Sequence, residues 1–213
     1  MNKLKEKELE RLTNLKSIEE EIYKTGIDTI CGIDEAGRGP LAGPVVVAAV
    51  IMPRSSMIEG VNDSKKVSEK KREILYDKIL DEAISYGVGI IDQKEIDSIN
   101  ILNATKKGLT TAVKQLKVKP QRILVDALEN IDTCGIPYTS IIKGDAKSYS
   151  IAAASIIAKV TRDRIMREWA EVYPQYNFEK HKGYGTAAHI AAIKEYGLTP
   201  LHRLSFVKNI IKA

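Results

Sequence analysis

The sequence has few cysteines, and they form no recognisable motif. Cys31 and Cys134 are the only two in 213 residues, and neither lies in a Cys-x-x-Cys pair. This scarcity argues against a disulfide framework and fits a reducing, cytoplasmic setting. Cys31 falls within an apolar stretch, so we expect it to be a small core residue rather than a ligand.

Long apolar runs are also missing. The run Val45–Met52 has eight residues, far short of the roughly 20 that a membrane-spanning helix needs. The N-terminus is charged from its first residues and contains no apolar signal-peptide core, so we expect neither a secretion signal nor a membrane contact.

Aromatic residues and excess charge of one sign are both modest. Aromatics make up 6% of the chain, and nine of the twelve are tyrosine. The net charge of +5 is compatible with a nucleic-acid partner but is not specific for one. The length and the 44% hydrophobic content suit one substantial domain with small additions.

The most informative stretch lies between residues 29 and 47. It has the pattern of a strand (29–33), an acidic pair, a glycine-rich loop and a second strand (45–52). Asp34 and Glu35 are placed where the first strand must end, since glycines follow at once. Carboxylates at the edge of an apolar strand must be solvated, paired with cations or holding a metal. Adjacent strand residues point to opposite faces, so the two acids share one site only if the chain bends there.

The loop itself, Gly37-Arg38-Gly39-Pro40, allows several interpretations. Its glycines let backbone N–H groups approach a ligand, and Arg38 between them is suited to a phosphate. A tight turn in which Arg38 pairs with the preceding acids is an equally simple alternative. A nucleotide-binding P-loop is disfavoured, because the Lys-Ser/Thr ending is missing and Pro40 would break the helix that should follow.

The rest of the chain alternates predicted helices and strands. Further strands are expected at 86–91, 122–126 and 136–142, and helices at 2–24, 68–83, 93–116, 148–164 and in a short segment ending at 196. Short loops favour antiparallel pairing of the early strands, and intervening helices favour parallel pairing of the later ones. The pattern predicts an α/β fold with a five-stranded mixed sheet flanked by helices and a C-terminal helical region. Residues 1–26 are expected to form an N-terminal helical extension, and residues 27–213 the main domain.

Four acids follow predicted strands. Asp126 ends the fourth strand and Asp145 comes shortly after the fifth, so both could meet Asp34 and Glu35 at one sheet edge. Each has a simpler alternative, because Asp126 would also serve as a strand terminator and Asp145 as a helix cap. Taken together, they favour a site for Mg²⁺ or Mn²⁺. Two such ions would suit phosphodiester cleavage.

Other polar residues are expected to be structural. Asp163 lies between two arginines on a predicted helix, which favours a surface or interhelical ion pair. The three histidines lack metal-ligand spacing. His181 beside two lysines, and His202 beside Arg203, are typical of basic surface, whereas His189 is expected to be a structural helix residue.

Seven segments occur in an order and spacing that resemble bacterial ribonuclease HII, a type 2 ribonuclease H family. They are Gly32–Val45, Asn62–Lys66, Val125–Ala127, Lys143–Asp145, Ala152–Asp163, His181–Thr186 and His202–Phe206. The similarity spans residues 28–207, and an ordered set of this kind is far more specific than any one segment.

The resemblance implies an RNase H-like fold and an endonuclease that needs Mg²⁺ or Mn²⁺. Such an enzyme cuts the RNA strand of RNA–DNA hybrids, incises on the 5′ side of single ribonucleotides in duplex DNA, and leaves 3′-hydroxyl and 5′-phosphate ends. By position, the resemblance places the metal-binding acids at Asp34, Glu35, Asp126 and Asp145. The family's GRG motif, which contacts the ribose 2′-hydroxyl, corresponds to Gly37, Arg38 and Gly39. The junction-sensing tyrosine corresponds to Tyr184, and a segment near the substrate backbone to Ser64 and Lys65.

Three alternatives remain at this point. Ribonuclease HIII is similar, but it usually has lysine at the position of Arg38 and carries a separate N-terminal domain for which residues 1–26 are too few. A non-catalytic nucleic-acid-binding domain is disfavoured by the four intact acids. Another nuclease of the same fold is disfavoured by the GRG loop and Tyr184. The expected protein is a cytoplasmic monomer.

Overall fold

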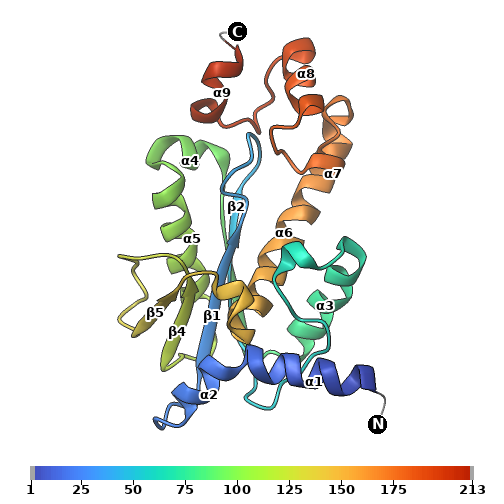
Figure 1. Cartoon of the computed structure of the whole chain (residues 1–213). Helices are drawn as coiled ribbons and strands as arrows, with labels where there is room; N and C mark the ends of the chain where they lie inside the picture. The colour runs from blue at the N-terminus through green and yellow to red at the C-terminus, as the bar shows by residue number, and fades with distance from the viewer. Residues whose placement is uncertain (1–2, 212–213) are drawn as a thin grey trace.

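The computed structural model describes residues 3–211 and consists of a five-stranded sheet with helices on both faces (Figure 1). The strands are β1 (Ile30–Ala36), β2 (Val45–Ile51), β3 (Ser85–Ile91), β4 (Arg122–Asp126) and β5 (Tyr138–Ile141). The helices are α1 (Lys3–Leu15), α2 (Ser17–Tyr23), α3 (Glu69–Glu82), α4 (Gln93–Ile99), α5 (Ile101–Lys114), α6 (Tyr149–Val172), α7 (Phe178–His181), α8 (Ala187–Tyr196) and α9 (Leu204–Ile211), with short 3₁₀ turns η1 (Ser64–Lys66), η2 (Gly144–Ala146) and η3 (Pro174–Tyr176).

The sheet is mixed, as the sequence predicts. Its strand order is β3-β2-β1-β4-β5. The β1–β2 and β2–β3 pairs are antiparallel, whereas β1–β4 and β4–β5 are parallel. The early strands are joined by connections that reverse direction, and the chain reaches β4 only after crossing the sheet through α4 and α5. The expected fold class is therefore confirmed.

The two faces of the sheet are covered by different helices. Helix α6 packs on one face with α3, burying Ala48 and Val50 of β2, and α5 packs on the other face against Ile33 and Val47. The approach of α6 is unusually close, because a Cβ at Gly32 would lie 2.1 Å from the backbone carbon of Ser150. The run of small residues in α6 permits this contact, as its uncharged sequence indicated.

The N-terminal helices are integrated with this core. Leu12 and Leu15 of α1 are buried in the cluster that α3 and α6 share. The helix expected over 2–24 divides at Lys16, whose ammonium group donates to the backbone carbonyls of Arg54 and Ser56. Glu19 of α2 accepts a 2.6 Å hydrogen bond from the Ser148 hydroxyl, at the first turn of α6. Residue 2 lies outside the described residues.

A second, smaller core lies at the far end of α6. Helices α7, α8 and α9 gather there (Figure 1), and Met166, Tyr176 and Phe178 are buried among them. An antiparallel bridge between Ala42 and His202 ties the β1–β2 loop to this region. The C-terminal region therefore packs against the glycine-rich loop and holds it in place.

Several predicted boundaries are wrong. Strand β1 does not end before the acidic pair but continues to Ala36, since it stays paired with β2 as far as Val46. The helix expected over 93–116 is split at Asn100, which has a φ of 65° and caps α5. The fifth strand begins only at Tyr138. Among residues 3–211, no helix combines the length and the apolar character that would let it cross a membrane.

Candidate active site

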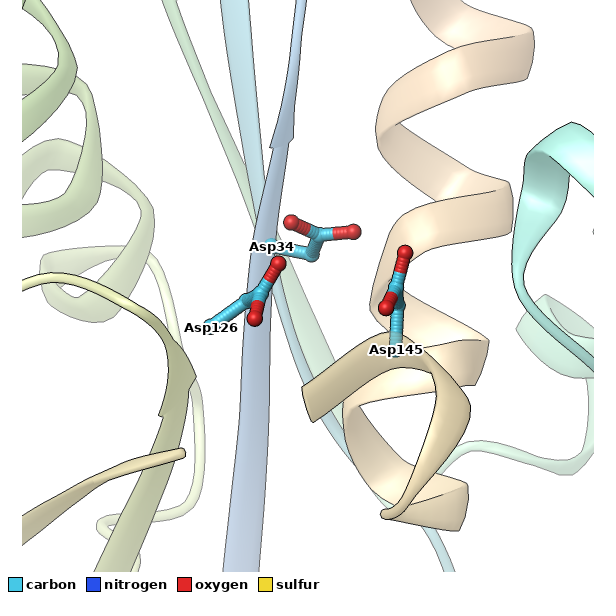
Figure 2. Close-up of side chains that lie close together, drawn as sticks. All are labelled: Asp34, Asp126 and Asp145. Carbon is cyan, nitrogen blue, oxygen red and sulfur yellow. The ribbon is translucent and has the colours of Figure 1, made fainter. Parts of the chain in front are cut away.

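Sheet register brings the first two acids together. The parallel ladder between β1 and β4 pairs Ile33 with Val125, so Asp34 and Asp126 are the next residues on neighbouring strands. Parallel strands present such positions side by side at the same sheet edge. Asp34 is on the face covered by α6, and Figure 2 shows its side chain projecting from β1 toward that helix, close to the carboxylate of Asp126.

The third acid comes from the turn before α6. Asp145 lies in η2, and the neighbouring Gly144 N–H donates a 2.7 Å hydrogen bond to Asp126 Oδ1. This bond ties the turn to the end of β4. Asp34, Asp126 and Asp145 each offer a carboxylate oxygen within 4.8 Å of the others (Figure 2). Residues that are far apart in sequence thus form one acidic cluster.

Burial and mutual repulsion disfavour charge in this cluster. The pKa of Asp34 is raised well above its ordinary value, first by burial and then by the Glu35 charge. The pKa of Asp145 is raised by burial and by the nearby Asp63. A divalent cation would relieve both effects, because carboxylate oxygens are the ligands that hard cations prefer. The three side chains therefore fit a hard divalent cation.

Glu35 lies beside this cluster but outside the 4.8 Å group. Because β1 stays extended, Glu35 follows the strand alternation away from Asp34. Its Oε1 is 3.4 Å from Arg38 Nη1, whereas its Oε2 is buried without a hydrogen-bond partner. Burial raises the pKa of Glu35, and the nearby Arg38 charge opposes that rise. The ion pair between Arg38 and a preceding acid, which the sequence offered as an alternative, is thus present. The second carboxylate oxygen of Glu35 is left for another partner.

Two buried arginines hold the glycine-rich loop through hydrogen bonds to its backbone. Arg203 donates to the carbonyls of Gly37, Arg38 and Gly43, at 2.6 to 3.0 Å. Arg162 donates to the carbonyls of Ala42, Pro44 and Lys182, at 2.9 to 3.1 Å. Because these carbonyls accept hydrogen bonds from buried side chains, the glycine-rich loop is fixed in position next to the acids.

Gly37 and Gly39 suit this loop for different reasons. Gly37 has a φ of 98°, and a Cβ there would lie 2.1 Å from Arg162 Nε. A Cβ at Gly39 would instead meet only the Tyr184 ring, at 3.9 Å. Arg38, between them, has a half-exposed side chain. The loop therefore presents open backbone and one cation next to the acidic cluster.

Comparison with known proteins agrees with this geometry. The family model for ribonuclease HII matches residues 31–209. A ribonuclease HII from Acetivibrio thermocellus is 60% identical over 206 residues, covering 97% of this chain and 80% of that protein. The chain belongs to the ribonuclease HII family.

Solved structures support the fold. The ribonuclease H2 from Pyrococcus horikoshii OT3 superposes with a TM-score of 0.74 at 30% identity, covering 86% of this chain and 97% of that one. Bst-RNase HIII in complex with Mn²⁺ superposes with a TM-score of 0.66 at 20% identity, covering 86% of this chain and 69% of that one, and so shows the shared fold alone. The resemblance recognised in the sequence is confirmed: this ribonuclease HII family member is a ribonuclease H endonuclease, and divalent-metal dependence is general for its family.

Of the other predicted substrate-binding residues, two lie on η1 and the third follows α7, beside Gly39. Lys65 has a largely exposed side chain whose Nζ lies 3.5 Å from Asp145 Oδ2. Ser64 is buried, and its hydroxyl forms a 2.8 Å hydrogen bond with Ser155 of α6. Ser64 therefore anchors the η1 turn, and Lys65 extends from it over the acids. Tyr184 is 45% exposed, and the Arg162 guanidinium lies 5.9 Å from its ring centroid.

Sequence reasoning missed some residues and misplaced others. Asp63 is buried beside the cluster and accepts a 3.0 Å hydrogen bond from the Lys65 N–H, and only its place in the Asn62–Lys66 motif hinted at a role. The assignment of His202 and Arg203 to basic surface is wrong, because they are 3% and 0% exposed. Asp163 forms the interhelical alternative of its predicted ion pair, 3.4 Å from Arg72 of α3.

Proposed function

We propose that this ribonuclease HII family member hydrolyses the RNA strand of RNA–DNA hybrids and incises 5′ to single ribonucleotides in duplex DNA, leaving 3′-hydroxyl and 5′-phosphate ends. The observation that carries the proposal is the convergence of Asp34, Asp126 and Asp145 beside the GRG loop. Acids alone would suit many phosphodiesterases, whereas the adjoining loop offers recognition of ribose.

Asp34, Asp126 and Asp145 would hold Mg²⁺ or Mn²⁺, and Glu35 is proposed as a further ligand through its unpartnered oxygen. Bound divalent ions, two in our proposal, supply an activated water and stabilise the leaving oxygen. Mn²⁺ is the ion named for the ribonuclease HIII structure. A cluster of like charges at this edge is costly without a cation, which supports a resident metal.

Substrate recognition is assigned to the groups around the acids. The half-exposed Arg38 and the exposed Lys65 are cations suited to the phosphates that flank the cut. The backbone of the loop formed by Gly37, Arg38 and Gly39, which is exposed at Gly39, would read the ribose 2′-hydroxyl, the group that distinguishes RNA from DNA. Tyr184 would stack on the sugar that follows the ribonucleotide and favour a deoxyribose there. These assignments follow the family motifs that the sequence contains.

The decisive test is a labelled DNA duplex containing one ribonucleotide, incubated with Mg²⁺, Mn²⁺ or chelator beside an all-DNA control. We expect one metal-dependent cut on the 5′ side of the ribonucleotide and an intact control. Cleavage of long hybrids without this cut would contradict the junction role of Tyr184. Binding of both substrates without cleavage would support the non-catalytic alternative. The cytoplasmic location and the monomeric state stay predictions, which cell fractionation and light scattering would test.

A further inference from the structure

The three histidines gather at one place in the C-terminal core. His181 of α7 and His189 of α8 stack with ring centroids 4.4 Å apart, and His202 lies 5.2 Å from His189. His189 is 0% exposed and His202 is 3% exposed. No acid is paired with any of them within residues 3–211. Buried imidazoles without a counter-ion must be satisfied by hydrogen bonds in their neutral form.

The shortest contact of His202 Nδ1 decides the arrangement of protons, because this nitrogen is closer to the Thr199 N–H than to the Thr199 carbonyl oxygen, which lies 3.3 Å away. The Thr199 backbone N–H can only donate, and it lies 2.9 Å from His202 Nδ1, so that nitrogen is the acceptor. The proton of His202 is then on Nε2, which is 3.1 Å from His189 Nε2. His189 must accept there and carry its own proton on Nδ1.

The chain of hydrogen bonds ends on the backbone of Tyr184. His189 Nδ1 is 3.0 Å from the Tyr184 carbonyl oxygen, to which the tautomer derived above donates. The Tyr184 N–H in turn donates to the His181 carbonyl at 2.9 Å. Both sides of this residue are therefore held, while its ring remains half exposed above Arg162 and next to Gly39.

Burial supports the neutral assignment. It lowers the pKa of His189 to about 4 and also lowers the pKa of His202. The neighbouring His181 and His202 rings further disfavour a positive charge on His189.

We propose that His202 and His189 are positioning residues for substrate specificity. Their neutral tautomers form a relay that runs from Thr199 to the carbonyl of Tyr184 and fixes where the Tyr184 ring meets the sugar that follows the ribonucleotide. The relay rests on the proposed function of Tyr184, because its effect on catalysis is exerted through that ring alone.

Two substitutions of His189 separate hydrogen bonding from packing. His189→Asn keeps a nitrogen donor near the Nδ1 position, whereas His189→Phe keeps a planar ring and loses the donor. The measured quantity is the rate on a single embedded ribonucleotide divided by the rate on a uniform RNA strand in a hybrid. We expect His189→Phe to lower this ratio about tenfold, since small misplacements of a positioning group are costly, and His189→Asn to change it less than about twofold. Equal losses in the two variants would overturn the relay in favour of simple packing.

A second measurement needs no substitution. Imidazole ¹⁵N chemical shifts at pH 7.5 should show His202 protonated on Nε2 and His189 on Nδ1. The opposite tautomer at either ring, or a charged imidazolium, would overturn the relay.

If His189→Phe fails to fold, His202→Gln provides the test, because its amide nitrogen lies near the Nε2 position and should keep the parental ratio.

Tyr184→Ala is the reference that separates the two proposals. If it lowers the ratio while His189→Phe does not, the relay is wrong and the role of Tyr184 stands. If Tyr184→Ala leaves the ratio at the parental value, the junction role fails and with it the specificity role of the relay, while the ¹⁵N shifts still report whether the tautomers were assigned correctly.

Discussion

The two ends of the candidate active site differ in how they accommodate buried charge. At the sheet edge, Asp34, Asp126 and Asp145 crowd together, and Glu35 keeps a buried oxygen without a partner. In the C-terminal core, Arg162 and Arg203 are fully buried, yet each donates to three backbone carbonyls. The comparison teaches that unsatisfied polar groups indicate a place for a ligand, whereas satisfied ones indicate a scaffold.

The two regions also differ in how their charges respond to burial. Burial lowers the pKa of Arg162 to about 10 and that of Arg203 to about 9, so both stay charged at neutral pH. In and beside the acidic cluster, burial raises the pKa of Asp34, Glu35 and Asp145, so a nearby cation would favour their charged forms. Substitutions should therefore impair catalysis at one end and stability at the other.

The largest effect is expected for Asp126→Asn. It should lower cleavage by more than about 100-fold, because losing a direct ligand should cost more than losing a group that only orients one. Folding and hybrid binding should persist, and the thermal midpoint should stay level or rise as like-charge repulsion falls. Single-turnover cleavage, filter binding and thermal unfolding would measure these three quantities. Asp77→Asn, an exposed acid of α3, is the control, and a parental rate in Asp126→Asn would refute the site.

At the other end, Arg203→Met should lower the free energy of unfolding by at least about 3 kcal/mol. Three loop carbonyls lose their donor, and each buried unsatisfied group costs about 1–3 kcal/mol. Urea unfolding monitored by circular dichroism would check this. Arg167→Met removes a partly exposed guanidinium of α6 that pairs with Glu69 and Glu73 of α3 and should cost less than about 1 kcal/mol. Similar losses of unfolding free energy in the two variants would show that the buried Arg203 guanidinium stabilises the fold no more than Arg167 does.

Metal binding should stabilise the acidic end alone. Mn²⁺ at 100 times its dissociation constant should raise the free energy of unfolding by about 2.7 kcal/mol, since it binds only the folded chain. Chelator should reverse the gain, which a thermal-shift titration would follow. The gain should vanish in Asp126→Asn and persist in His189→Asn. An equal gain in Asp126→Asn would place the ion elsewhere.

Acidification should weaken the histidine core. In the unfolded chain His189 takes up a proton below its ordinary pKa of 6.5, whereas in the folded protein it does so only near 4. Between these values the unfolded state binds more protons, so this contribution to stability is complete above pH 6.5 and is lost as the pH falls toward 4. Urea unfolding at pH 7.5, 6.0 and 5.0 should show a decline that is shallower in His189→Asn. Equal pH slopes in the two proteins would contradict the buried neutral ring.

The smallest effect on stability is expected for Tyr184→Ala, within about 0.5 kcal/mol, because the ring is half exposed. Cleavage at a single embedded ribonucleotide should nevertheless fall about tenfold, because aromatic stacking on a nucleotide contributes about 1–3 kcal/mol. A gel assay of both substrates would measure this selectivity. Tyr86→Ala removes an equally exposed ring from the edge strand β3 and should change neither activity. Parallel loss on both substrates in Tyr184→Ala would argue against junction sensing.

The sequence by itself determined the layered fold and the location of the acids along it. Apolar strands of the right length and an uncharged small-residue helix specify a covered sheet, and the observed strand Arg122–Asp126 has the predicted bounds. The ordered motifs identified the family, because residue types and their spacing can be compared directly along the chain, without a structure. The roles of Asp34, Glu35, Asp126 and Asp145 were predicted in the same way and await the experiments above.

Tertiary structure alone decided how these residues meet. Sheet register set Asp34 beside Asp126, and strand alternation, which only a bend in the chain could have overcome, kept Glu35 outside their group. Arg203 and His202 were predicted to lie at the surface, because a local sequence pattern does not reveal partners from distant parts of the chain. In the fold, Arg203 donates to a loop carbonyl and His202 bonds to a second imidazole. Burial of polar groups depends on partners from elsewhere in the chain, so their environment emerges only when the chain has folded.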